Sequence, residues 1–167
     1  MKNFANIIDN ANEWTGKICS FAIIPLTFIV ALDVTLRYIF NSPLPWGLDV
    51  AIQLMGFIVF MGLGYTLLHK GHICVDVFSS KLSAKGQAIL DLITFPFFLL
   101  SIGCLLWVAV PVAITSTATK EVFPSYVMPP IYPFRIVIAL GLFLLALQGI
   151  AKFIRDFSLA TSAGEKK

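Results

Sequence analysis

Charged residues are scarce in this sequence. Only 13% of its 167 residues are Asp, Glu, Lys or Arg, whereas 58% are hydrophobic. A soluble domain of this length carries about twice that charged share, and a small fold has too much surface for its volume to hide so much apolar area. The composition therefore excludes an ordinary soluble domain and indicates that lipid surrounds most of the chain.

Cysteine and histidine are also rare, with three and two residues respectively. An odd number of cysteines argues against a disulfide framework. His69, His72 and Cys74 lie close together in the sequence, but their spacing and number do not match a closed metal site. Neither histidine lies inside an apolar run, which excludes a pair of axial haem ligands. We therefore expect no cofactor, no metal and no catalytic residue.

Basic residues are too dispersed for a nucleic-acid partner. The net charge is +3, and the lysines and arginines sit in tails and loops instead of one patch. Binding to phosphate backbones requires clustered Lys and Arg. Nucleic acid is therefore not an expected partner.

Long apolar runs are what the sequence has instead. Because a hydrocarbon core of about 30 Å requires about 20 helical residues, four runs qualify as spans: residues 18–36, 50–68, 89–110 and 131–153. Only helices satisfy their own backbone polar groups in lipid without closing into a barrel. The sequence therefore predicts an all-α integral membrane protein with a four-helix membrane domain over residues 18–153.

Two amphipathic segments flank these spans. Residues 1–17 place apolar and polar side chains at helical spacing on different faces, which fits either an interfacial helix lying on the membrane or an extension of the first span. Residues 75–85 show a similar pattern and predict a short surface helix between the second and third spans. The polar stretch 154–167 is expected to be a cytoplasmic tail.

The distribution of Lys and Arg predicts the orientation. Nine of these residues flank the spans on the side that holds both termini and the second loop, against three on the opposite side. Since loops rich in Lys and Arg stay in the cytoplasm, both termini are expected there. The predicted location is the inner membrane of a bacterium, with lipid as the surrounding medium.

The middles of the four runs contain no Asp, Glu, Lys, Arg or His. Charges inside a membrane usually mark ion or substrate paths, so this chain is not expected to bind a substrate by itself. Asp33 and Arg37 lie four residues apart near the end of the first run. They are expected to form a local ion pair, with a polar contact to a partner chain as the alternative.

A specific resemblance appears in the first loop and the span after it. The run Arg37-Tyr38-Ile39-Phe40-Asn41-Ser42-Pro43-Leu44-Pro45-Trp46 is followed by Asp49, then by Phe60-Met61-Gly62, and then by Lys70-Gly71-His72-Ile73-Cys74-Val75-Asp76. This pattern resembles the small membrane subunit, of DctQ type, of tripartite ATP-independent periplasmic (TRAP) transporters. Where that family usually has one or two glutamates after the tryptophan, this chain has Gly47-Leu48-Asp49.

The resemblance implies two partners. One is a large multi-span membrane subunit that holds the substrate and sodium sites, and the other is a periplasmic binding protein that delivers an organic acid. The small subunit would brace the large one. Arg37, Trp46 and Asp49 on one side and His72 and Asp76 on the other are the predicted interface residues. Trp46 fits an interfacial aromatic anchor equally well, and His72 with Asp76 fits a helix cap.

Two other classes of function compete with this interpretation. An independent ion-coupled exporter, acting as a dimer, would require an acidic residue in the middle of a span. A membrane redox enzyme would require cofactor ligands or a thiol pair. The sequence provides neither feature, and this favours the transporter subunit.

Overall fold

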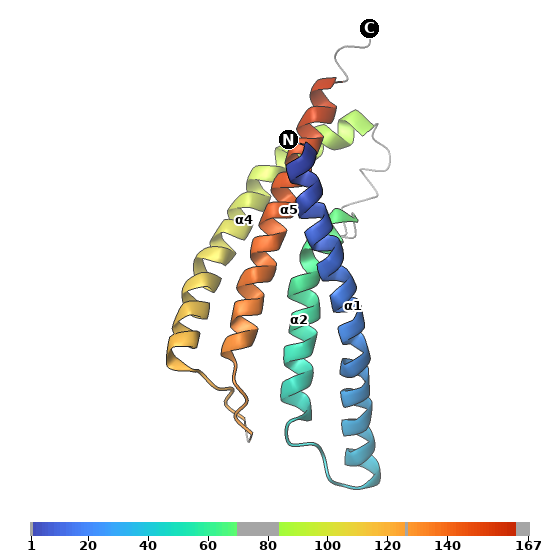
Figure 1. Ribbon diagram of the computed structural model, residues 1–167, viewed down its shortest axis with the longest axis vertical. Coiled ribbons are helices and arrows are strands. Elements are labelled where there is room, and N and C mark those ends of the chain that lie inside the picture. Colours follow the sequence, from blue (N-terminus) through green and yellow to red (C-terminus); the bar gives the residue numbers. More distant parts are fainter. Residues whose placement is uncertain (1, 70–83, 126, 163–167) are drawn as a thin grey trace.

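The computed structural model describes residues 2–69, 84–125 and 127–162 of the chain. Within these residues the chain forms long helices joined by short connections (Figure 1). The helices are α1 (Lys2–Ile39), α2 (Gly47–Leu68), α4 (Ala84–Thr119) and α5 (Tyr132–Ser162). Each is long and apolar enough to cross a membrane. The prediction of an all-α membrane protein with four spans is therefore confirmed.

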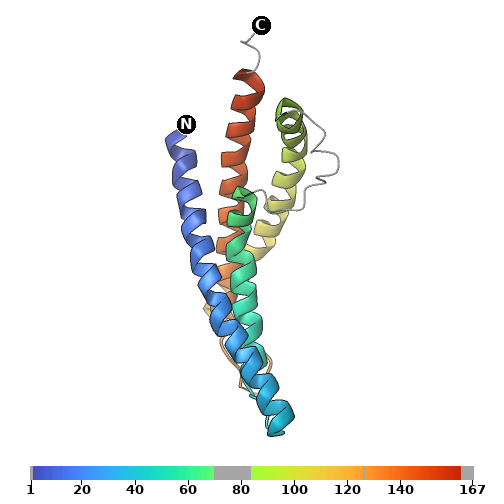
Figure 2. The ribbon, with the colours of Figure 1, turned by 90° about the vertical axis from the view of Figure 1, so that its right-hand side faces the viewer.

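The helices form an open array instead of a closed bundle. Their order across the molecule is α1, α2, α5 and α4 (Figure 1), and α4 makes its main helix contacts with α5. Both ends of the described chain lie at one end of the array, and the α1–α2 and α4–α5 connections lie at the other (Figures 1 and 2). This arrangement leaves one long face of α4 without a neighbour among the described residues.

Small residues allow α2 to approach both of its neighbours closely. A Cβ atom on Gly141 of α5 would overlap the carbonyl oxygen of Phe60, and one on Gly64 would overlap the side chain of Asn12 of α1. Lipid tails are as apolar as leucine, so helices in a membrane associate through close packing and hydrogen bonds instead of hydrophobic burial. These two glycines therefore set how near α2 lies to α5 and to α1.

The amino-terminal segment is continuous with the first span. α1 runs without interruption from Lys2 to Ile39, as in the alternative that extends the span. Ile8 is buried against Ala151 and Leu147 of α5, whereas Ile7 and Trp14 are exposed. The predicted apolar face of residues 1–17 is thus divided between a helix contact and an open surface. An interfacial position for this segment stays a prediction.

The α4–α5 connection folds into a small hairpin. α4 ends where Lys120 adopts a φ of 48°, and the N–H of Glu121 returns to the carbonyl of Ser116, which is a common way to end a helix. Residues 122 and 130 then form an isolated antiparallel bridge. The predicted surface helix at residues 75–85 lies outside the described residues, apart from its last two positions.

Candidate functional site

A chain of side-chain hydrogen bonds joins α1 to α5 near the termini. Asn12 Nδ2 donates to Gln148 Oε1 (2.7 Å) and to the carbonyl of Ile8 (3.1 Å). Gln148 Nε2 donates to Asp9 Oδ1 (2.8 Å), and Arg155 donates to the other oxygen of that carboxylate (2.5 Å). Asn12 and Gln148 are both fully buried. Because each donor faces a distinct acceptor, this series of hydrogen bonds fixes the position of α1 along α5.

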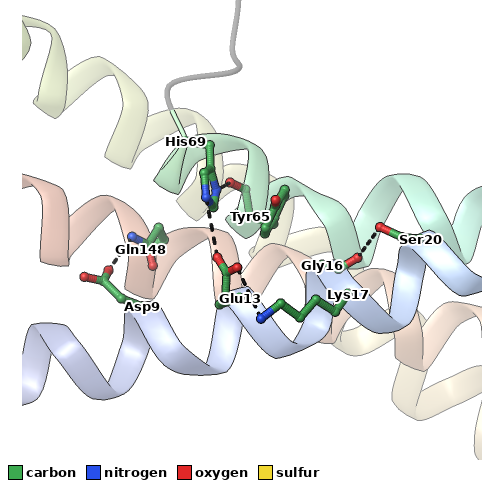
Figure 3. A network of polar contacts seen from close by, with 8 residues as sticks. All are labelled: Asp9, Glu13, Gly16, Lys17, Ser20, Tyr65, His69 and Gln148. Carbon is green, nitrogen blue, oxygen red and sulfur yellow. Dashed lines mark hydrogen bonds and ion pairs between the residues drawn. The ribbon is translucent and has the colours of Figure 1, made fainter.

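The same end of the molecule joins α1 to α2. The Glu13 carboxylate lies 3.5 Å from His69 Nε2 and 3.6 Å from Lys17 Nζ (Figure 3). The ring of Tyr65 packs against His69, with ring centroids 4.2 Å apart, and covers Gly16 of α1. We call the polar groups at this end the terminal cluster, which comprises Asp9, Asn12, Glu13, His69, Gln148 and Arg155.

The opposite end holds a second set of polar contacts. Asp33 Oδ2 accepts a hydrogen bond from Arg37 (2.5 Å), and Asp33 Oδ1 accepts one from the backbone N–H of Leu44 (2.9 Å). The Asp33 carboxylate also lies beside Gly47, the first residue of α2. The expected Asp33–Arg37 ion pair is thus present, and it also ties the first loop to α1.

Asp49 attaches the hairpin to α2. Its carboxylate accepts a hydrogen bond from the Ser125 hydroxyl (2.5 Å), and Gln53 donates to the carbonyl of Pro130 (3.4 Å). A negative charge is favourable in the first turn of a helix, which is where Asp49 lies. We call the polar groups at this end the loop cluster. It comprises three pairs in contact: Asp33 with Arg37, Asp49 with Ser125, and Glu121 with Arg135.

The two clusters are separated by about the thickness of a hydrocarbon core. Glu13 and Asp33 contact opposite ends of α2, and they lie 20 residues apart on one helix, or about 30 Å. Gln148 lies inside the fourth predicted span, residues 131–153, but it belongs to the terminal cluster and therefore lies near the membrane edge. Its interhelix hydrogen bonds hold α5 against α1.

The described interface candidates differ in how accessible they are. The Arg37 side chain is half exposed and Trp46 is 40% exposed, so both can reach a partner. Asp49 is 6% exposed, and its carboxylate is engaged within the chain by Ser125. His72 and Asp76 lie outside the described residues. The role of all five in binding a partner stays a prediction.

Most of the terminal cluster was not anticipated from the sequence. Asn12 and Gln148 are the only buried amide side chains among the described residues. The available signal was a polar residue inside an apolar run, at Gln148, or just before one, at Asn12. Their pairing joins positions 136 residues apart. No periodicity within one helix contains that information.

An apolar cavity of about 360 Å³ lies between α2, α4 and α5. Its wall consists mainly of aliphatic and aromatic side chains, with charged groups from α5. The lining residues are Leu67, Leu92, Thr94, Phe95, Phe98, Leu145, Gly149, Lys152, Phe153 and Asp156. Such a wall does not suit a small anionic solute, because an anion requires several converging donors to replace its water.

Asp33 and Arg37 should contribute unequally to stability. Asp33 is nearly buried at 9% exposure and also holds the backbone of Leu44, whereas exposed ion pairs contribute little. We expect Asp33→Ala to lower the free energy of unfolding by about 2 kcal/mol and Arg37→Ala by less than about 1 kcal/mol. Unfolding with sodium dodecyl sulfate in mixed micelles, followed by circular dichroism, measures both. A larger loss for Arg37→Ala contradicts this interpretation.

The fold and these contacts define a small membrane protein whose charged side chains, among the described residues, lie toward the two ends of its spans. Residues 26–159 match the family described as "Tripartite ATP-independent periplasmic transporters, DctQ component". The chain therefore belongs to the DctQ family of TRAP transporter subunits. The family is one of transporter subunits and not of enzymes.

A relative in Haemophilus influenzae supports the assignment. That protein is named "Putative TRAP transporter small permease protein" and is 32% identical over 94 residues. The similarity covers 56% of this chain and 56% of the relative. It thus spans little more than half of that protein's length.

Proposed function

We propose that this chain is the small permease subunit of a TRAP-type secondary transporter and that it braces a large transport subunit in the membrane. Membership of the DctQ family supports the proposal. The observation that carries it is the placement of polar groups. Polar contacts that cross between helices gather in the terminal and loop clusters, and the helix segments between them contain no charged residue.

Such a molecule is suited to bracing and not to carrying a solute. A secondary transporter that works by itself has polar sites and broken helices at mid-depth. Here residues 18–32, 50–68, 99–119 and 136–147 lie between the two clusters and include no Asp, Glu, Lys, Arg or His. The substrate and ion sites accordingly belong to the large subunit, and this chain binds no substrate by itself.

The transport cycle proposed for the complex is sodium-driven uptake. A periplasmic binding protein delivers a carboxylate-bearing organic acid, such as a C4-dicarboxylate or a sialic acid, and the large subunit carries it across. The small subunit lies in the bacterial inner membrane. Both termini are cytoplasmic, as the excess of Lys and Arg near the termini indicates. The first loop and the hairpin then face the periplasm.

Co-purification tests this proposal. The full chain, tagged at its carboxyl end, is expressed with the large membrane subunit and the binding protein, and the complex is extracted in mild detergent. Mass spectrometry of the eluate should find the large subunit at a stoichiometric amount. Uptake of radiolabelled organic acid in vesicles should require both membrane chains and a sodium gradient. Recovery of this chain by itself, with uptake unaffected by its deletion, contradicts the proposal.

The independent exporter has less support. Its best coupling residue would be Asp33, but that carboxylate lies in the loop cluster and is bound by Arg37 and by the N–H of Leu44. An acid that takes up and releases protons during transport needs to be at an accessible site within the span. Transport by the purified chain, lost in Asp33→Asn, would favour the exporter instead.

A further inference from the structure

The outer face of α4 carries a tryptophan in an unusual position. Trp107 is 84% exposed and points away from α5, because the buried residues of α4 (Ile102, Ala113 and Ser116) lie on the other side of the helix. Tryptophan is enriched at membrane interfaces, where its ring meets apolar groups and its N–H meets water or headgroups. The depth of Trp107 in the membrane therefore decides whether its indole N–H can reach water or headgroups.

One contact between α4 and α5 places Trp107 near the middle of the membrane. Phe98 of α4 packs on Gly149 of α5, and Gly149 follows Gln148 of the terminal cluster. Phe98 is therefore level with that cluster. Trp107 lies nine residues further along α4, or about 14 Å. This distance is close to half of a hydrocarbon core of about 30 Å.

An indole at this depth lacks a hydrogen-bond acceptor in lipid. Among the contacts of the described residues, Trp107 donates no hydrogen bond, and hydrocarbon offers no acceptor. The exposed tryptophan of α1, Trp14, does not have this problem. Trp14 is next to Glu13 of the terminal cluster, and Lys17 lies 5.9 Å from its ring centroid, so headgroups and water are within its reach. The indole of Trp107 therefore requires an acceptor from another protein helix, whereas the indole of Trp14 does not.

The side chains around Trp107 have the spacing of a helix-packing surface. Phe97, Leu100, Cys104, Trp107, Pro111 and Ile114 are all exposed and follow one another at alternating steps of three and four residues. A stripe with this spacing is one along which a second helix can pack at a shallow angle. One turn before Trp107, Gly103 has no atom within 4 Å of an added Cβ. A small residue beside a large one provides a notch for a partner's side chain.

We infer that the outer face of α4, centred on Trp107 and Gly103, binds a transmembrane helix of the large subunit. The partner helix offers a hydrogen-bond acceptor at mid-depth, from a Ser, Thr, Asn or Gln side chain or from a freed backbone carbonyl. Its side chains fill the notch at Gly103. The inference rests on the proposed function, because it takes the large subunit as the partner, and adds the face and the chemistry of the contact.

Photocrosslinking in membranes tests the contact directly. The photoreactive residue p-benzoylphenylalanine replaces Trp107 or, as the matched control, Trp14, in cells that produce the full complex. Irradiation should link position 107 to the large subunit and leave position 14 without a protein adduct. If the wild-type chain recovers no large subunit, the proposed function fails. If it recovers the subunit but position 107 gives no adduct, or links two copies of this chain, only the inference fails.

A pair of glycine variants tests the notch without a photoreactive group. Gly103 and Gly62 are both open to an added Cβ atom, so Gly103→Leu and Gly62→Leu should both leave the helical content of the purified chain unchanged. We expect Gly103→Leu to reduce the recovered large subunit about tenfold, and Gly62→Leu to have little effect. Equal recovery with the two variants overturns the assignment of this face.

Discussion

Replacing Gly141 with alanine is expected to destabilise the chain by about 3 kcal/mol, because the new methyl group has no room. An alanine Cβ at this position overlaps the carbonyl oxygen of Phe60, a backbone atom of α2. A side chain could rotate away, but a carbonyl within a helix cannot move without shifting the helix. The α2–α5 contact should therefore open. Unfolding with sodium dodecyl sulfate, followed by circular dichroism, gives the change.

Gly62→Ala is the control for this prediction. An added Cβ on Gly62 meets no atom within 4 Å, and alanine is favoured over glycine in a helix by about 1 kcal/mol. The control variant should therefore be as stable as the wild-type chain or slightly more so. If both variants behave alike, close packing at Gly141 is not what holds α2 against α5.

Gln148→Leu should give the second large effect, a loss of about 2 kcal/mol. The amide of Gln148 is fully buried and connects Asn12 to Asp9. Leucine has a similar size but removes both hydrogen bonds, and it leaves the buried Asn12 Nδ2 with only the carbonyl of Ile8 as its acceptor. The same unfolding measurement applies. Ser101→Ala is the control, because the Ser101 hydroxyl is exposed and bonds to its own helix, and it should change stability by less than about 0.5 kcal/mol.

A double-mutant cycle separates the network from its parts. Asn12→Leu and Gln148→Leu each take one hydrogen-bond partner from the other buried amide, whereas the double variant removes both amides. The double variant should therefore lose less stability than the sum of the two single variants, by about 1 kcal/mol. Strict additivity would show that the two side chains act separately.

The sequence predicted the elements well because each span satisfies its own backbone. In lipid an apolar run of about 20 residues has to be helical, so the four spans follow from local composition. The ends of the helices were less predictable. α4 continues to Thr119, past the predicted end at Val110, and the hydroxyls of Thr115, Thr117 and Thr119 bond to carbonyls one turn earlier. Polar residues can thus lie in the last turns of a helix that begins as an apolar run.

The candidate site was predictable only where its contacts are local. The Asp33–Arg37 pair lies within one turn of one helix, so spacing was enough to predict it. The contact of Asp49 with Ser125 joins α2 to the hairpin, and nothing in the first loop indicates which partner Asp49 has. Likewise, the span 131–153 does not show how deep Gln148 lies, because that depends on which residues of the neighbouring helices lie beside it.

The sequence by itself determined the class of protein, the four helical spans and the absence of charge between their ends, because lipid acts on each span separately. The tertiary structure decided the order of the helices across the array, the pairing of Asn12 with Gln148 and the open face of α4. These features depend on which surfaces meet, and in a membrane that choice is made by small residues and a few hydrogen bonds. Gly64 and Gly141 look like any other glycines until the helices that pack on them are known.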